Sequence, residues 1–417
     1  MLPRGFWKGF GPGLLWAAAA IGVSHLVQST RAGAMAGFGL AGVVLLALIF
    51  KYPFFEFGPR YAAATGQSLV EGYDAIGRWA LWLFFGLTIV SSIIVQSAVV
   101  MFTAFLFRYM LGVSWPLPVA GALVVGVCIL ILVIGQFRWL DRAIKLVLMA
   151  LAVSTLTAAA VALPRADFGT LALIPDIGGP TGVSFAFLLA LAGWMPSALD
   201  IAVWNSLWTL AKNRESGTRA SLATALLDFN IGYVGTGVLA FAFVLLGAAV
   251  MYHSGASFRP QGPAFSVQLV ELYSSTLGAW LKPVVLVAVF ATMFSTSLTV
   301  IDGYPRALDR CVQHLAGAKH PGRGTPPARA YWIMMAGLAV ATVVILAAFL
   351  GNLTQMVDFA TIFTFLTAPV LGWLNLRAVK SPAVPAECRP GPVLTAVAWF
   401  GLVLLGGTAA VYLLSLM

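Results

Sequence analysis

The chain has 417 residues, of which 60% are hydrophobic and only 9% are charged, and its formal net charge is +10. A soluble domain carries about 25% charged residues, so this composition excludes a soluble enzyme or binding module. It predicts an all-α integral membrane protein whose first partner is the lipid bilayer. We expect no nucleic-acid partner, because membrane topology accounts for the positive charge.

Eleven apolar segments are long enough to cross the hydrocarbon layer, which needs about 20 residues per helix. They cover approximately residues 11–34, 40–64, 79–109, 117–137, 143–163, 182–210, 220–251, 277–301, 330–350, 354–377 and 392–416. No hydrophilic stretch between them is long enough for a soluble domain. We therefore expect residues 1–417 to form a single transmembrane domain.

Lysine and arginine gather on one side of this arrangement. With the N-terminus in the cytoplasm, 18 of the 24 basic residues fall on the cytoplasmic side, five fall on the other side, and Lys51 lies within a span. This is the positive-inside pattern, and eleven spans then place the C-terminus outside. The short loops and the absence of a sorting signal predict the inner (plasma) membrane of a bacterium.

The first apolar segment contains a short polar break at Gly22-Val23-Ser24-His25. A helix broken at membrane depth exposes N–H and C=O groups that lipid cannot satisfy. Such a break survives only where it lines a cavity or a bound solute. The sequence therefore predicts a discontinuous first helix beside a binding site.

The sixth apolar segment has a matching break at Met195-Pro196-Ser197-Ala198-Leu199-Asp200. Five spans precede the loop near residues 163–180 and five follow it, so the two halves are inverted and span one corresponds to span six. Inverted five-span repeats with broken first members resemble the LeuT-like transporters. We place repeat one at about 11–163, repeat two at about 182–377 and an eleventh, extra helix at about 392–416.

The residues at the two breaks are the candidate substrate-binding site. Imidazole can ligate a metal, take up a proton or bond to a substrate. The carboxylate can coordinate a cation, carry a proton or cap the second half-helix, and the thioether can be a soft ligand or packing. The candidates are Gly22, Ser24, His25, Met195, Ser197 and Asp200, and a metal ion would bind Met195, Asp200 and His25.

Other ionisable residues inside spans are candidates for a proton path or a gate, because such groups are costly in a bilayer. They are His25, Glu56, Asp228 and Asp358. Lys51 lies five residues before Glu56, and we expect a structural pairing of the two or a lysine that snorkels to the interface.

Two loops connect the later spans. We expect residues 252–276 to cover the outer face. The basic segment 302–328, rich in proline and glycine, is predicted to be a cytoplasmic connector.

Several segments together resemble the Nramp metal transporters. They are Gly11–Leu15, Ala32–Ala34, Gly37-Phe38, Thr65–Glu71, Met195-Pro196 and Phe294–Ser297. The resemblance implies a secondary transporter with the LeuT-like fold. It departs at the breaks, where the family has Asp-Pro-Gly-Asn and Met-Pro-His-Asn. Of the ligating side chains that the resemblance implies, only Met195 persists, so the site is remodelled.

Three functions follow from these features. The first is transport of a small cation, foremost a divalent metal ion, by alternating access, with coupling to protons and no cofactor. The second is transport of a small zwitterionic or anionic organic solute whose carboxylate would meet the half-helix N-termini. The third is a sensor that transports nothing. No motif of a soluble enzyme competes with them.

Overall fold

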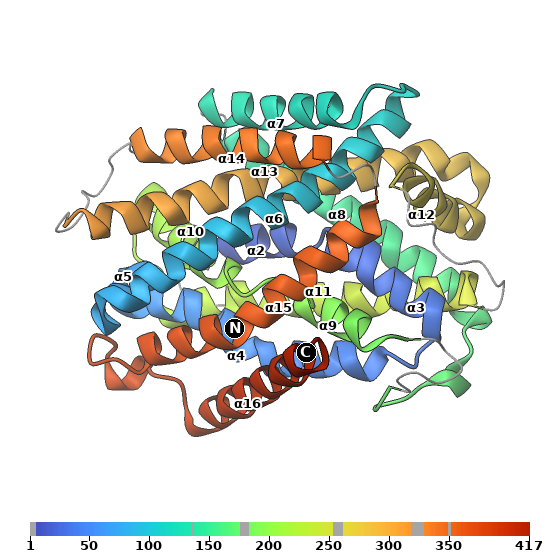
Figure 1. Cartoon of the computed structure of the whole chain (residues 1–417). Helices are drawn as coiled ribbons and strands as arrows, with labels where there is room; N and C mark the ends of the chain where they lie inside the picture. The colour runs from blue at the N-terminus through green and yellow to red at the C-terminus, as the bar shows by residue number, and fades with distance from the viewer. Residues whose placement is uncertain (1–5, 135–136, 176–182, 253–261, 318–328, 349–351) are drawn as a thin grey trace.

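The computed structural model describes residues 6–134, 137–175, 183–252, 262–317, 329–348 and 352–417, and nearly all of them are helical (Figure 1). The α-helices are α1 (Phe6–Gly9), α2 (Pro12–Ala20), α3 (Thr30–Ala36), α4 (Ala41–Thr65), α5 (Leu69–Ile76), α6 (Arg78–Leu111), α7 (Leu117–Val133), α8 (Phe137–Ala162), α9 (Phe185–Gly193), α10 (Ile201–Ser216), α11 (Leu222–Val250), α12 (Gly262–Leu277), α13 (Lys282–Leu315), α14 (Arg329–Ala348), α15 (Leu353–Val379) and α16 (Pro392–Ser415). A π-helix, η1, covers Ser24–Ser29, and the short 3₁₀ turns are η2 (Leu163–Arg165), η3 (Phe168–Thr170), η5 (Ala279–Leu281) and η6 (Ala386–Cys388).

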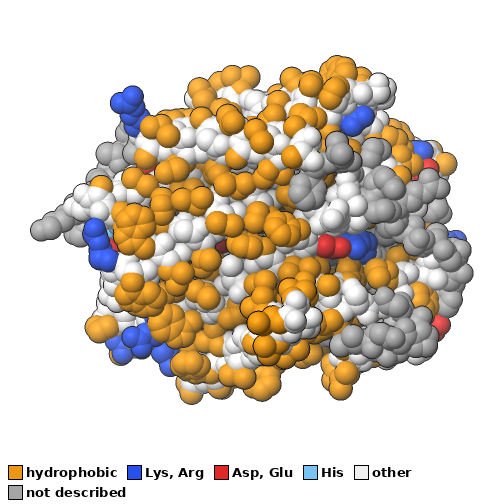
Figure 2. Space-filling model, viewed as in Figure 1, with side chains coloured by type: hydrophobic (Ala, Val, Ile, Leu, Met, Phe, Trp, Pro, Cys, Tyr) orange, Lys and Arg blue, Asp and Glu red, His pale blue; other side chains and the backbone are white. Residues whose placement is uncertain are grey.

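The predicted spans are confirmed as helices. In the part of the chain that the structure describes, seven helices are long and apolar enough to cross a membrane, namely α4, α6, α11, α13, α14, α15 and α16. Helices α7 and α8 and two interrupted pairs supply the other predicted crossings. The outward faces carry large apolar side chains such as Leu130, Val340 and Val403, and hydrophobic side chains cover most of the face in Figure 2. This surface suits lipid.

Both predicted helix breaks are present. The first span runs through α2, loses its regular helix at Ile21 and Gly22, and continues through η1 into α3. The sixth span consists of α9 and α10, separated by the non-helical residues 194–200. The breaks thus leave backbone groups free inside the protein.

The helices form two packed groups. We call α2, α3, α4, α9, α10 and α11 the bundle, and α6, α7, α13 and α14 the scaffold, because the members of each group pack on one another. In Figure 1, α7, α14 and α13 lie along the top and α4 lies near the bottom, with α2 between them. The first span meets both groups, since α2 packs against α11 and α13.

Helix α11 holds both halves of the first span through close backbone contacts at glycines. A Cβ atom on Gly13 of α2 would lie 2.1 Å from the carbonyl oxygen of Asp228 in α11. A Cβ atom on Gly247 of α11 would lie 2.2 Å from the carbonyl oxygen of Thr30 in α3. Small residues allow this approach in membrane proteins, so α11 fixes where the first break lies.

Two loop predictions are wrong in part. Residues 262–276 of the expected outer loop belong to α12, and residues 302–315 of the expected connector continue α13. The helix continues past the apolar segment because Arg306 and Asp302 form an i,i+4 salt bridge of 2.7 Å, which supports a helix in polar surroundings. Residues 253–261 and 318–328 of these two loops lie outside the described residues.

Candidate functional site

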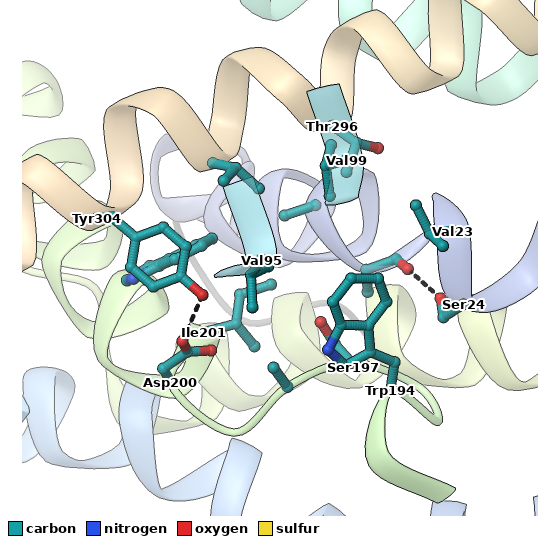
Figure 3. Close-up of a pocket in the computed structure, with 15 residues that line it drawn as sticks. Val23, Ser24, Val95, Val99, Trp194, Ser197, Asp200, Ile201, Thr296 and Tyr304 are labelled. Carbon is teal, nitrogen blue, oxygen red and sulfur yellow. Dashed lines mark hydrogen bonds between the residues drawn. The ribbon is translucent and has the colours of Figure 1, made fainter. Parts of the chain in front are cut away.

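A small cavity lies between the two breaks, where the bundle faces the scaffold (Figure 3). It offers about 30 Å³ to a water-sized molecule. The bundle side is lined by Ala19, Ala20, Val23, Ser24, Trp194, Ser197, Ala198, Asp200, Ile201 and Trp204, and the scaffold side by Val95, Val99, Thr296, Val300 and Tyr304. The walls are thus mostly apolar, with hydroxyl groups and one carboxylate.

Asp200 supplies that carboxylate. It stands at the N-cap position of α10, but its side chain makes no capping hydrogen bond. Its Oδ2 atom instead accepts hydrogen bonds from the Tyr304 hydroxyl at 2.7 Å and the Ser91 hydroxyl at 3.0 Å. Figure 3 shows the tyrosine hydroxyl pointing toward the carboxylate. Asp200 is 4% exposed, so two hydroxyl groups of the scaffold hold a buried acid at the cavity wall.

A second, smaller cavity of about 10 Å³ lies on the other side of Asp200. Ser91, Ala198 and Leu199 line it together with residues of α15 such as Thr364 and Thr367. Asp200 and Ala198 belong to both cavities. The carboxylate therefore lies between two small spaces with hydroxyl groups in their walls.

Ser24 reaches the main cavity, whereas His25 faces away from it. The His25 Nε2 atom lies 2.9 Å from the carbonyl oxygen of Thr236 in α11, and because a carbonyl can only accept, Nε2 carries a hydrogen. Its Nδ1 atom lies 2.7 Å from the Ser24 Oγ atom, which is also 2.7 Å from the carbonyl oxygen of Ala20. The imidazole therefore connects to the cavity only through a serine hydroxyl.

Gly22 and Met195 do not line the cavity. Met195 is fully buried, before a proline with which it forms a cis peptide bond. At Gly22, a Cβ atom would lie 2.8 Å from the Thr296 hydroxyl oxygen. That hydroxyl group lies 3.3 Å from the carbonyl oxygens of Ala18 and Ile21. The glycine thus lets Thr296 of α13 approach the first break.

The expected pairing of Lys51 with Glu56 is wrong. Glu56 forms a salt bridge of 2.5 Å with Arg60, one helical turn further on. The Lys51 ammonium donates instead to the carbonyl oxygens of Ala192, Gly193 and Ser197. Positions five apart point about 140° away from each other on a helix, which separates the two side chains.

The remaining proton or gate candidates lie away from the cavity. Asp358 of α15 accepts two hydrogen bonds from the Arg31 guanidinium of α3, at 2.7 and 3.1 Å. Asp228 of α11 accepts from the backbone N–H groups of Gly11 and Gly13 at 3.0 and 2.6 Å, and so binds the start of α2. Each acid joins a half of the first span to another helix.

The structure thus brings together Ser24, Ser197 and Asp200 of the predicted site. Within the described residues, no group of three or more His, Cys, Asp or Glu side chains could hold a metal ion. Ser91, Thr296 and Tyr304 were not predicted from the sequence. Tyr304 lies in the segment that was predicted to be a connector. Ser91 could have been found, because it is a polar residue inside the apolar third span.

The comparisons with known proteins agree with this fold. The family model for the natural resistance-associated macrophage protein-like (Nramp) family matches residues 13–415. The chain is 36% identical over 371 residues to the uncharacterized protein PM0681 of Pasteurella multocida, a match that covers 88% of this chain and 84% of that protein.

Two solved structures show how widely the fold is shared. A mutant of a manganese transporter of Eremococcus coleocola superposes with a TM-score of 0.77 at 14% identity, covering 99% of this chain and 88% of that one. MhsT in complex with L-phenylalanine gives a TM-score of 0.67 at 14% identity, over 98% of each chain. Identities this low establish the LeuT-like fold alone. Together with the family match, they show that the chain belongs to the Nramp family of integral membrane transporters and is not an enzyme.

Proposed function

We propose that this protein is a secondary-active transporter that moves a small cation, foremost a divalent metal ion, by alternating access through the cavity between the two breaks. The observation that carries the proposal is the Asp200 carboxylate, buried at the cavity wall with hydroxyl groups around it. A buried acid is costly unless it is paired, and a bound cation would be its partner. Membership of the Nramp family supports the same cargo.

The size of the cavity favours an ion. A cavity needs about 10–15 Å³ of such space to hold one water molecule, and this one offers about 30 Å³. An ion with a water molecule fits this space, whereas a zwitterionic solute requires the walls to move apart. The cavity size therefore ranks the inorganic ion first.

The donor atoms favour a hard cation. The side-chain oxygen donors at the cavity are the carboxylate of Asp200 and the hydroxyl groups of Ser24, Ser197, Thr296 and Tyr304. Oxygen donors suit Mg²⁺ and Mn²⁺, and softer ions prefer sulfur and nitrogen. The thioether of Met195 and the imidazole of His25 are outside the cavity lining, so we expect manganese or magnesium ahead of cadmium or copper.

Coupling to protons would run through Ser24. When the His25 ring is neutral, the Ser24 hydroxyl donates to Nδ1 and keeps both lone pairs. A protonated ring donates to that oxygen, which leaves one lone pair, and the serine hydrogen then turns to the carbonyl oxygen of Ala20. Because the protonated ring also repels a cation at Ser24, the two would compete, and His25→Gln is expected to remove the pH dependence of uptake.

The other acids would control access. The Arg31–Asp358 pair would close the cavity at its end next to α3. Asp228 would hold α2 in place at the opposite end of the first span. Glu56 is tied to Arg60, which also donates to the carbonyl oxygen of Cys388 at 2.7 Å. It would hold α4 to the segment before α16.

The orientation in the membrane is part of the proposal. The distribution of basic residues supports a bacterial inner membrane, a cytoplasmic N-terminus and an external C-terminus. Some residues in that count lie outside the described residues, namely Arg4, Arg259, Lys319 and Arg323.

One observation favours an organic solute as the second candidate. The indole N–H groups of Trp194 and Trp204, both in the cavity wall, have no hydrogen-bond partner among the described residues. An N–H donor suits an acceptor such as a carboxylate and cannot ligate a metal. A solute with a carboxylate group would use both donors once the cavity widens.

Uptake by purified protein in liposomes tests the proposal. We would supply Mn²⁺, Mg²⁺, Zn²⁺, Cd²⁺ or Cu²⁺ and compare wild type with Asp200→Asn and with Glu215→Gln, an acid-to-amide change on the exposed end of α10. We expect saturable Mn²⁺ uptake that falls at least about tenfold in Asp200→Asn, because a contact to a charged group is worth about 1.5 kcal/mol or more. Glu215→Gln should match wild type.

Two results would contradict the proposal. Full uptake by Asp200→Asn would remove the carboxylate from the mechanism. If folded protein moves no ion but moves a radiolabelled amino acid, the organic solute is the cargo, and if it moves neither, the sensor function gains.

A further inference from the structure

Lys51 is a buried ammonium group in the middle of α4. Its Nζ atom lies 3.1 Å from the carbonyl oxygen of Ala192, 2.8 Å from that of Gly193 and 2.7 Å from that of Ser197. Lys51 is 1% exposed. An ammonium has three N–H donors and no acceptor, so each donor meets one oxygen.

These carbonyl groups lie where the sixth span breaks, and that of Ala192 also accepts from the backbone N–H of Met195 at 3.4 Å. Ala192 and Gly193 are the last residues of α9, and Ser197 lies in the non-helical segment before α10. The C-terminal end of a helix carries partial negative charge and carbonyl oxygens without partners in the helix. At membrane depth such oxygens attract a cation.

The surroundings of the ammonium fit a bound cation. The Phe55 ring centroid lies 5.6 Å from Nζ. Glu56, on the same helix, is taken by Arg60. On the neighbouring helices, Asp228 binds the start of α2 and Asp358 binds Arg31.

We propose that the carbonyl oxygens of Ala192, Gly193 and Ser197 form a monovalent-cation site and that Lys51 is its tethered occupant. The Lys51 ammonium holds the three carbonyl groups of the second break together. Without the lysine, a free cation would have to do so. The proposal does not depend on which substrate is transported. It assigns a second cation site, since Lys51 is not among the residues that line the main cavity.

Ser197 connects the two sites. Its carbonyl oxygen accepts from Lys51, and the residue also lines the main cavity beside Trp194 and Ala198. The ammonium thus fixes the backbone that forms one cavity wall. Asp200 belongs to the same non-helical segment, three residues after Ser197.

Thermal melting of the purified protein tests the proposal. Lys51→Ala empties the carbonyl site, and we expect its melting temperature to rise by about 5 °C with saturating Na⁺, K⁺, ammonium or methylammonium. Choline at the same ionic strength is the control, because it is too large for three converging carbonyl groups. Wild type and Lys212→Ala, a change on the exposed part of α10, should show no such rise.

A second variant separates charge from hydrogen bonding. Lys51→Gln keeps N–H donors but has no charge, and we expect it to melt below wild type. If Lys51→Ala responds to none of these cations beyond choline, or if wild type responds equally, the proposal is overturned. If Lys51→Ala does not fold, Lys51→Gln decides, since a Gln variant as stable and active as wild type would show that hydrogen bonds alone are needed. Melting requires no transport, so this test can fail or succeed independently of the uptake assay.

Discussion

Glu71 shows how one charged side chain joins two helices. It lies in α5, outside the spans, and accepts hydrogen bonds from the Ser68 backbone N–H at 2.7 Å and from the Ser68 hydroxyl. The Arg310 guanidinium of α13 forms a salt bridge with it, and the His314 Nε2 atom lies 3.0 Å away. Burial by itself raises the pKa of Glu71, but the hydrogen bond from His314, the charge of Arg310 and the bond from Ser68 lower it to about 2.

The lowered pKa predicts a pH-dependent contribution to stability. The pKa of Glu71 falls from 4.5 to about 2 on folding, so its charge stabilises the fold above about pH 4.5 and this contribution is lost as the pH falls toward 2. We expect Glu71→Gln to melt several degrees below wild type at pH 7, and the difference to shrink below pH 4.5. Melting curves between pH 7 and pH 3 check this, with Glu215→Gln as control. A difference that stays constant with pH would contradict it.

Some side-chain contacts can be predicted from the sequence and others cannot. Glu56 and Arg60 have the i,i+4 spacing of a helical ion pair, so their contact could be predicted. The partners of Lys51 could not, because they are backbone oxygens about 140 positions away that lie at the break after α9. Asp200 was found from its place at the break, but its partner Tyr304 was hidden in an apparent loop.

At the scale of helices, α11 is the element against which the first span is fixed. Gly13 and Gly33 of the first span, and Gly232 and Gly247 of α11, each face a backbone carbonyl group where a Cβ atom would lie 2.0–2.3 Å away. The two halves of the broken span are therefore held by backbone-to-backbone packing. If the first span and α11 were pushed apart, the first break would move.

Added methyl groups test this packing. A Cβ atom on Gly247 must push α3 away, which costs roughly 1–3 kcal/mol or more. At Gly235, on the same helix, a Cβ atom would have nothing within 4 Å, and alanine is the better helix former by about 1 kcal/mol. We expect Gly247→Ala to lower the melting temperature clearly and Gly235→Ala to leave it equal or higher. Equal melting temperatures would show that the helices are not in close contact.

The contact between α3 and α15 depends on the Arg31–Asp358 pair. The Arg31 guanidinium binds both oxygens of Asp358 and lies 4.7 Å from the centre of the Phe187 ring of α9. A bidentate pair of this kind is among the stronger hydrogen-bonded contacts. It would resist opening of the cavity on this side.

Labelling of a cysteine in the cavity measures that resistance. We would place the cysteine at Val23 in a Cys388→Ser background, since Cys128 and Cys311 are buried, and apply a membrane-impermeant maleimide from the Arg31 side. Asp358→Asn should be labelled at least about ten times faster, because a charge-assisted contact worth about 1.5 kcal/mol is lost. Asp167→Asn, in the loop between η2 and η3, is the control. An unchanged rate would exclude a gating role.

Element positions were largely predictable, because hydropathy marks each span and glycine, proline and polar residues mark the breaks. Besides α12 in the expected outer loop, the eighth span was an exception. Its apolar part ends near residue 301, yet α13 runs to Leu315. Hydropathy marks only the part of a helix that lies in the membrane. The helix itself continues as long as hydrogen bonds and ion pairs such as Arg306–Asp302 support it, so α13 ends later than its apolar segment.

At the scale of the whole molecule, the cavity lies where the bundle meets the scaffold. Both helix breaks belong to the bundle, and the hydroxyl groups that hold Asp200 come from α6 and α13 of the scaffold. A relative movement of the two groups would therefore open the cavity and change the contacts of the acid together. This arrangement supports alternating access around Asp200.

Anomalous scattering from a crystal of the wild-type protein soaked in Mn²⁺ tests whether Asp200 binds the cation. The proposed function predicts a manganese peak in the cavity between the breaks, within about 2.5 Å of an Asp200 carboxylate oxygen, and its loss in Asp200→Asn crystals. A peak elsewhere, or one that remains in Asp200→Asn, would contradict the assignment of Asp200 as the cation ligand.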